Sequence, residues 1–176
     1  MDTQGVAALH HHRSLHAGGK NTKTSPGTGQ LSYFIFEGVL TGVFGRDQIY
    51  ITAWSGGAGG SKKLKPTDDA NNPYSYGVKE VSDPKNPTRG GPIPPGPYRI
   101  LPPGRDAHLG LCSRLVPQFT PLNHRGGFAI HGQGPKGSDG CIVIPHKDFH
   151  RLMDKLAQSG GGHLHVCETM DDGVFV

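Results

Sequence analysis

Short apolar runs separated by glycine and proline predict a chain built mainly of β-strands. The first strands are expected over residues 31–36, 39–44 and 48–54, with glycine-containing turns between them. In the third segment apolar residues alternate with Tyr50 and Thr52, as on a strand with one buried face. We therefore expect a meander of short antiparallel strands in the N-terminal half.

Four more strands are expected in the second half of the chain. One starts at Tyr98 after a proline-rich entry, and the others cover residues 127–131, 141–144 and 163–167. A helix is expected between the last two strands, because apolar residues recur there at helical spacing. They are Phe149, Leu152, Met153 and Leu156, with Pro145 and Asp148 as start signals and Gly160 as the stop signal.

Two turn-rich segments, residues 55–91 and 102–125, are expected to form loops. A loop as long as the first is uncommon inside a compact domain unless it serves a function. We therefore expect residues 55–91 to border a site.

Length and composition are those of one domain with a tail. The 176 residues divide into a polar, disordered tail over residues 1–30 and one domain over residues 31–176. Only 34% of the residues are hydrophobic, while 28 glycines and 15 prolines favour turns and short strands. The histidines of the tail are interpreted as part of a polar segment rather than a metal site.

The formal charge of +4 does not indicate a nucleic-acid-binding protein. Lys62, Lys63 and Lys65 form the only basic cluster, which is interpreted as a solvated loop. No apolar run is long enough to insert into a membrane, and the N-terminus lacks the apolar core of a signal peptide.

Three cysteines are present, and their spacing forms no CxxC pattern. The sequence leaves open whether Cys112 and Cys167 form a disulfide. His163 and His165 share one face of a strand but lack a third ligand, so we expect no metal and no cofactor.

The strongest chemical signal is a histidine and a cysteine on either side of a glycine-rich loop. His131 and Gly132 end one predicted strand, and Ser138, Gly140 and Cys141 precede the next. A hairpin-like closure of the two strands would place imidazole and thiol within hydrogen-bond reach. The thiol needs such a neighbour, because its ordinary pKa near 8.5 leaves it mostly protonated at pH 7.

The same residues suggest the rest of a catalytic site. Gly140 leaves the approach to the sulfur open, and the N–H groups near Gly140 and Cys141 are candidates for an oxyanion hole. Ser138 is expected to bond within the loop or to orient the ligand. No third catalytic side chain is evident, so a backbone carbonyl is expected to orient His131.

This segment resembles the signature of the L,D-transpeptidase (YkuD-like) catalytic domain, His-Gly followed by a variable loop and Ser/Thr-x-Gly-Cys. Over about residues 31–167 the chain is most similar to the type VI secretion L,D-transpeptidase effectors. The segments that carry this similarity are Trp54-Ser55-Gly56, Asn71-Asn72, Gly91 to Tyr98 and Arg125 to Gly132.

The resemblance implies a mainly β fold, an L,D-transpeptidase-like β-sandwich of short strands with one helix after the catalytic strand. It implies Cys141 as nucleophile and His131 as base and acid, assisted by Ser138 and Gly140. Gly132, Arg125 and Trp54 are expected to bind substrate.

One position departs from the cell-wall enzymes of the family. They carry an arginine two residues after the cysteine, where this chain has Val143. Arg125 or Arg99 is the candidate for the missing cation.

The implied reaction is acyl transfer on a peptidoglycan tetrapeptide stem. Cys141 would attack the carbonyl of stem residue 3, D-Ala would leave, and water, a D-amino acid or another stem would resolve the thioester. The resemblance also implies synthesis in the cytoplasm, delivery to the periplasm of a target cell and a cognate immunity protein. The alternatives are another cysteine peptidase or amidase of the cell wall, or an inactive peptidoglycan-binding module.

Overall fold

The computed structural model describes residues 28–85 and 87–172. Most of the predicted tail therefore lies outside the described residues. The first strand begins at Gly29, two residues before the expected start of the domain. Within these ranges, no helix is long and apolar enough to cross a membrane.

The N-terminal meander is confirmed. Strands β1, β2 and β3 pair in sequence as antiparallel neighbours, and a short strand β4 follows. Their bounds are Gly29–Phe34, Val39–Phe44, Asp47–Thr52 and Trp54–Ser55.

The second half holds six strands, two of which the sequence did not predict. Those two, β6 and β7, lie in the segment expected to be a loop over residues 102–125, so that expectation was wrong for these residues. Strand β7 was missed because Ser113 and Arg114 interrupt its apolar pattern. The bounds from β5 to β10 are Gly96–Ile100, Gly104–Asp106, Gly110–Pro117, Ala129–Gly132, Ile142–Ile144 and Gly162–Cys167.

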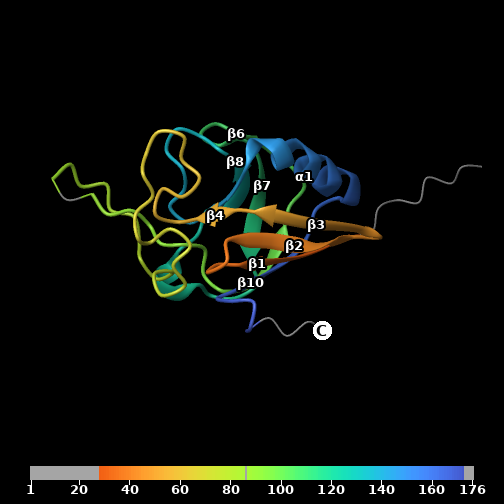
Figure 1. Cartoon of the computed structure of the whole chain (residues 1–176), viewed down its shortest axis with the longest axis horizontal. Helices are drawn as coiled ribbons and strands as arrows, with labels where there is room; N and C mark the ends of the chain where they lie inside the picture. Colours follow the sequence, from red (N-terminus) through yellow and green to blue (C-terminus); the bar gives the residue numbers. More distant parts are fainter. Residues whose placement is uncertain (1–27, 86, 173–176) are drawn as a thin grey trace, which may run out of the picture.

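The strands form one continuous path in the order β3-β2-β1-β10-β5-β7-β8-β9-β4, with β6 paired to β7. Strand β7 joins the two parts of this path, because residues 115–117 pair with β5 and residues 112–114 pair with β8. The mainly β fold class is confirmed, and the only α-helix of the described residues follows β9 (Figure 1).

Helix α1 spans His146–Ser159 and closes one side of the core. Its four predicted apolar residues are all buried. Gly160 ends the helix with a left-handed φ of 71°, which a glycine adopts without strain. The predicted helix and its stop signal are therefore confirmed.

The long loop between β4 and β5 gathers at one end of the sheet, drawn yellow to green in Figure 1. It contacts the segment that precedes Cys141. The Ala58 N–H donates to the Ser138 carbonyl at 2.9 Å, and the Gly90 N–H donates to the Asp139 carboxylate at 2.9 Å. The loop therefore borders the candidate site, as expected.

Within the described residues, the cysteines form no disulfide and no group of three or more His, Cys, Asp or Glu side chains could hold a metal ion. Cys112, Cys141 and Cys167 are all free thiols. His163 and His165 both lie on the exposed face of β10, as strand spacing predicts.

Candidate active site

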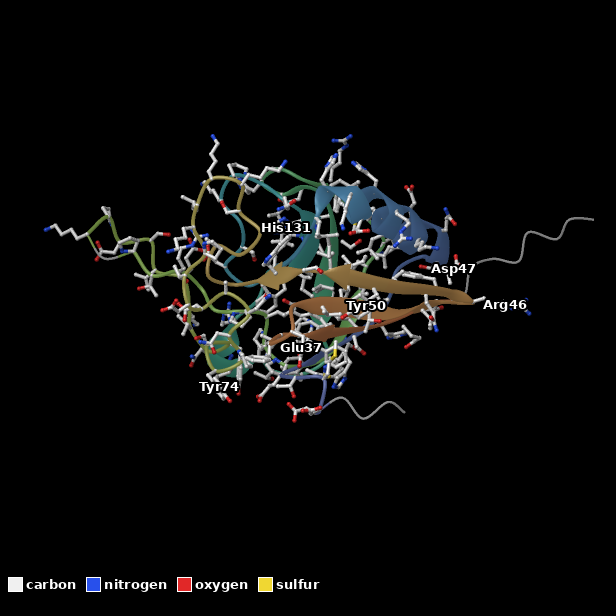
Figure 2. The ribbon with its side chains drawn as sticks, in the orientation of Figure 1. Glu37, Arg46, Asp47, Tyr50, Tyr74 and His131 are labelled. Carbon is white, nitrogen blue, oxygen red and sulfur yellow. The ribbon has the colours of Figure 1, made fainter. Side chains whose placement is uncertain are left out.

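Strands β7, β8, β9 and β4 carry the candidate site on the face that points away from the core. Their registers align Cys112, His131, Val143 and Trp54 in one row across the four strands. Directly paired residues point to the same face, and the intervening Ile130 belongs to the hydrophobic core. Figure 2 shows that His131 lies away from Arg46, which marks the β2–β3 turn.

A second row on this face contains Arg114, Ala129 and Cys141. Arg114 pairs with Ala129. Strands β8 and β9 pair in parallel with Ile130 opposite Ile142, and this register continued back by one residue places Cys141 beside Ala129. Cys141 and the imidazole therefore occupy neighbouring strands on one face.

The expected hairpin was wrong. Between β8 and β9 the chain returns through residues 133–141 and enters β9 in the direction of β8, so the strands are parallel. His131 pairs with Val143, which is two residues beyond Cys141. No hydrogen bond joins the thiol to the imidazole in the described part of the chain. Cys141 and His131 are therefore diagonal neighbours on adjacent strands, a separation that the His131 side chain can span.

Local hydrogen bonding fixes the protonation of His131. The ring atom Nδ1 lies 2.8 Å from the Gly132 carbonyl oxygen. Because a carbonyl only accepts, the neutral ring carries its proton on Nδ1 and its lone pair on Nε2. Burial lowers the pKa of His131, against the raising effect of the Gly132 carbonyl. At neutral pH the imidazole of His131 is therefore neutral, and a backbone carbonyl orients it, as expected; its role as a base stays a prediction.

The Cys141 thiol is protonated at neutral pH. Burial raises its pKa to about 11, although the Ala129 N–H and Arg114 both favour the thiolate. Its sulfur atom lies 3.9 Å from the Gly127 carbonyl oxygen, and the residue as a whole is half-buried. The ground state is therefore a neutral thiol beside a neutral imidazole.

Ser138 shapes the turn that presents Cys141. Its hydroxyl accepts the Gly140 N–H at 3.0 Å and donates to the Cys141 carbonyl at 2.8 Å. The Gly140 N–H is thus bonded within the turn, and its predicted place in an oxyanion hole stays a prediction. The Cys141 N–H has no partner among the turn and loop hydrogen bonds of the described residues. It is the remaining donor of the predicted pair.

Gly140 has to be glycine for a steric reason. Its φ is 138°, and a Cβ there would lie 2.7 Å from Nη2 of Arg125 and 2.9 Å from the Phe128 ring. The turn therefore combines a backbone conformation and a close approach that only glycine accommodates.

Ser55 fixes the same turn from strand β4. Its buried hydroxyl donates to the Gly140 carbonyl at 3.1 Å and accepts the Ile93 N–H at 2.9 Å. The Asn71 side chain in turn accepts the Ser55 N–H at 2.7 Å and donates to the Ala53 carbonyl at 3.1 Å. Residues from three distant segments thus hold the backbone next to Cys141.

Arg125 occupies the centre of this scaffold. Its guanidinium donates to the carbonyls of Tyr76, Pro92, Gly91 and Asp139, at 2.6 Å for Pro92, 2.7 Å for Gly91 and 3.0 Å for Asp139. Four of its five N–H donors are therefore used within the protein. Burial lowers the pKa of Arg125. Its placement is that of a structural cation, and its predicted contact with substrate stays a prediction.

The other two predicted substrate contacts also have structural partners. Gly132 supplies the carbonyl that orients His131, and a Cβ at Gly132 would meet the Phe149 ring at 3.3 Å. Trp54 is half-buried and packs against Gly60 beside Val143. Their contact with substrate also stays a prediction.

Sequence reasoning missed Arg114, the cation on the face that carries Cys141. It lies in a segment that had been interpreted as a loop, so its position relative to Cys141 could not be inferred. The alternation of Cys112, Arg114 and Val116 on one face was the available signal.

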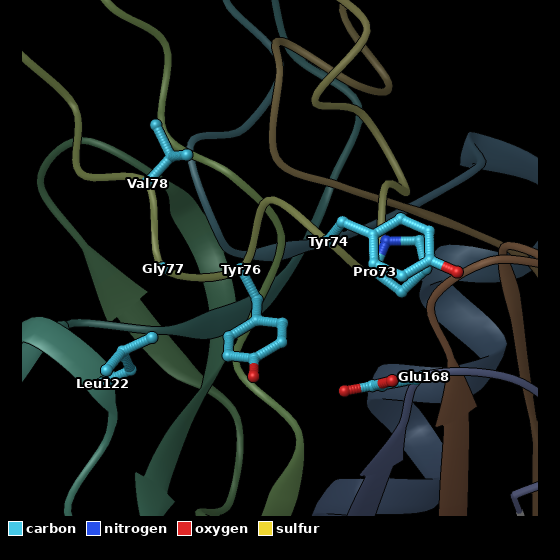
Figure 3. A pocket seen from close by; sticks show the side chains of 7 residues that line it. All are labelled: Pro73, Tyr74, Tyr76, Gly77, Val78, Leu122 and Glu168. Atoms are coloured by element: carbon cyan, nitrogen blue, oxygen red, sulfur yellow. The ribbon is translucent and has the colours of Figure 1, made fainter.

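An apolar hollow of about 280 Å³ lies outside this site. Tyr74, Tyr76 and Leu122 line it with Glu168 at its rim, as Figure 3 shows. Neither Cys141 nor His131 contributes to it. The candidate site is therefore identified by the side chains on the sheet face, and this hollow is separate from it.

No protein-family profile and no curated protein sequence matches the chain. Solved structures with a similar backbone include an L,D-transpeptidase (residues 123–326) from Xylanimonas cellulosilytica, with 15% identity, a TM-score of 0.48 and coverage of 82% of this chain and 62% of that one. An L,D-transpeptidase from Mycobacterium smegmatis shows 14% identity, a TM-score of 0.44 and coverage of 80% and 58%.

The helical cell shape determining protein Pgp2 (K307A mutant) from Campylobacter jejuni is similar at 11% identity and a TM-score of 0.48, with coverage of 82% and 51%. The chain thus spans less than two thirds of the length of each of these structures.

Proposed function

We propose that this protein is a cysteine-dependent acyl transferase of the L,D-transpeptidase type that acts on peptidoglycan stems. The observation that carries the proposal is the shared sheet face of Cys141 and His131. The lone pair of His131 lies on Nε2, the ring nitrogen that no group of the described residues occupies. The resemblance of the His-Gly and Ser-x-Gly-Cys segments supplies the substrate class.

The first step is general-base attack by the thiol. Nε2 of His131 takes the proton of Cys141 as its sulfur attacks the carbonyl of stem residue 3. The Cys141 N–H stabilises the oxyanion of the tetrahedral intermediate. The amide bond then breaks, the amine of D-Ala takes the proton back from His131, and a thioester remains on Cys141.

The second step resolves the thioester. Water gives L,D-carboxypeptidase activity, and a free D-amino acid gives exchange of the terminal residue. Hydrolysis shortens the tetrapeptide donors from which cross-links are made, and exchange replaces their terminal D-Ala, which suits an antibacterial role.

We extend the proposal to delivery. The resemblance to type VI secretion effectors supports a protein made in the cytoplasm, transferred to the periplasm of a rival cell and neutralised in the producer by an immunity protein. Expression with and without a periplasmic leader tests this part. Lysis is expected only with the leader and only with Cys141 intact, and equal tolerance of both forms would contradict it.

The enzymatic proposal is tested by mass spectrometry of tetrapeptide muropeptides incubated with the wild-type protein and with Cys141→Ala. We expect loss of one D-Ala, or its replacement by an added D-amino acid, with the wild type alone. Intact stems after incubation with reduced, folded protein would refute it. Cleavage at another bond would favour a cell-wall amidase.

A further inference from the structure

Arg114 is a partly exposed cation at the candidate nucleophile. It lies on β7 opposite Ala129, and Cys141 lies on the other side of the same alanine. Ala129 is fully buried and its methyl group is small, so no side chain of β8 separates the guanidinium from the sulfur. The Arg114 side chain keeps 43% of its surface exposed.

One carbonyl oxygen connects the two groups. Nη1 of Arg114 donates to the Gly127 carbonyl at 3.2 Å, and the Cys141 sulfur lies 3.9 Å from the same oxygen. Arg114 also pairs with Asp106 through Nη2. Within the described residues its other three N–H donors have no partner, so the guanidinium can take a further anion.

The other candidate cations fit less well. Arg125 is buried and uses four of its five donors on backbone carbonyls. Arg99 lies on β5, one strand farther from Cys141 than Arg114. Val143 occupies the position two residues after the cysteine and offers no charge.

We infer that Arg114 binds the free α-carboxylate of the residue that leaves when Cys141 attacks. The carboxylate of a C-terminal residue lies one residue, about 3.8 Å, beyond the scissile carbonyl. A cation beside the sulfur is therefore within reach of that carboxylate when the scissile carbonyl lies at the sulfur. This inference rests on the proposed function. It implies that Arg114 makes the site selective for donor peptides whose leaving residue carries the C-terminal carboxylate.

The test compares two donors, a tetrapeptide ending in D-Ala and the same peptide ending in D-alaninamide. The wild type is expected to prefer the acid in kcat/KM by about 10- to 100-fold, the worth of one charge-assisted hydrogen bond. Arg114→Gln is expected to lose most of this preference by slowing on the acid alone. Arg105→Gln, which removes an exposed cation from neighbouring β6, is the matched control and keeps the preference. An equal preference in the wild type and Arg114→Gln would overturn the inference.

A second readout does not depend on peptide turnover. Iodoacetate and iodoacetamide alkylate the same thiol, but only iodoacetate is an anion. Peptide mapping at Cys141 is expected to show an iodoacetate-to-iodoacetamide rate ratio that falls roughly tenfold in Arg114→Gln and stays unchanged in Arg105→Gln. An unchanged ratio in Arg114→Gln would refute the inference. Inactivity of the wild type on both peptides with a shifted ratio would refute the proposed function instead.

Discussion

The hydroxyl of Ser55 donates a hydrogen bond of 3.1 Å to the carbonyl of Gly140, the residue before the candidate nucleophile. The two residues are 85 positions apart in the chain, and both are buried. Because the same hydroxyl also accepts the Ile93 N–H, one side chain satisfies two buried backbone groups. The geometry at Cys141 thus depends on strand β4 and on the entry to β5.

Replacing Ser55 by alanine is expected to destabilise the fold and slow the reaction. Two buried backbone groups lose their partner, which costs about 2–3 kcal/mol in the free energy of unfolding. Urea denaturation measures this loss. Ser113→Ala is the control, since Ser113 is equally buried but its hydroxyl hydrogen-bonds, among the described residues, to the Met153 sulfur alone, at 3.8 Å. A similar loss in both variants would contradict the specific role of Ser55.

Replacing Gly140 by alanine is expected to cost about 2–4 kcal/mol of stability, since a Cβ both strains the backbone and overlaps Arg125 and Phe128. Thermal and urea unfolding of the variant measure the effect. Gly134→Ala in the same loop has open space around its Cβ and is expected to change stability by no more than about 0.5 kcal/mol. Tolerance of Gly140→Ala would show that the turn is not held as described.

Arg125→Met keeps the apolar stem and removes the charge. Four backbone carbonyls lose their donor, so we expect a loss of about 3 kcal/mol or more in the free energy of unfolding. Arg99→Met, on the exposed face of β5, is expected to stay within about 0.5 kcal/mol of the wild type. A stable Arg125→Met with a raised KM would instead assign Arg125 to substrate binding.

The pH dependence separates a neutral thiol–imidazole pair from a preformed ion pair. With a pKa of about 11, Cys141 carries more thiolate at each higher pH, so its alkylation by iodoacetamide is expected to rise about tenfold per unit between pH 7 and 10. A plateau between pH 5 and 8 would indicate a thiolate–imidazolium pair.

The fall of kcat/KM at acid pH reports the pKa of the general base. His131 acts unprotonated, and burial lowers its pKa below the ordinary value of about 6.5. Activity is therefore expected to persist below pH 6.5 and to fall only when the pH drops through the lowered pKa. An acid limb at or above pH 6.5 would contradict a buried His131 as the base.

The sequence predicted the elements that have strong periodic patterns. The helix around Leu152 and the meander around Leu40 and Ile51 follow from spacing alone. The strand holding Arg114 was missed, because two polar residues interrupt its apolar pattern and tertiary pairing with β8 and β5 stabilises it. Parallel pairing of β8 and β9 was likewise not predicted, since the nine residues between them are fewer than the dozen or more that usually connect parallel strands.

The candidate site was only partly predictable for a related reason. Cys141, His131 and Ser138 stand out because they lie close together in the sequence. Ser55 and Arg125 act through backbone groups of distant segments, and a single sequence does not reveal such contacts. Their structural role became clear only from the fold.

The central claim is that Cys141 carries the acyl group of stem residue 3. Intact-protein mass spectrometry after brief mixing with a purified tetrapeptide stem tests it most directly. An adduct equal to the stem without D-Ala, mapped to Cys141, is expected to accumulate in acid-quenched wild type and to be absent from Cys141→Ala. Unchanged peptide with no adduct at any quench time, or an adduct that persists in Cys141→Ala, would refute this role of Cys141.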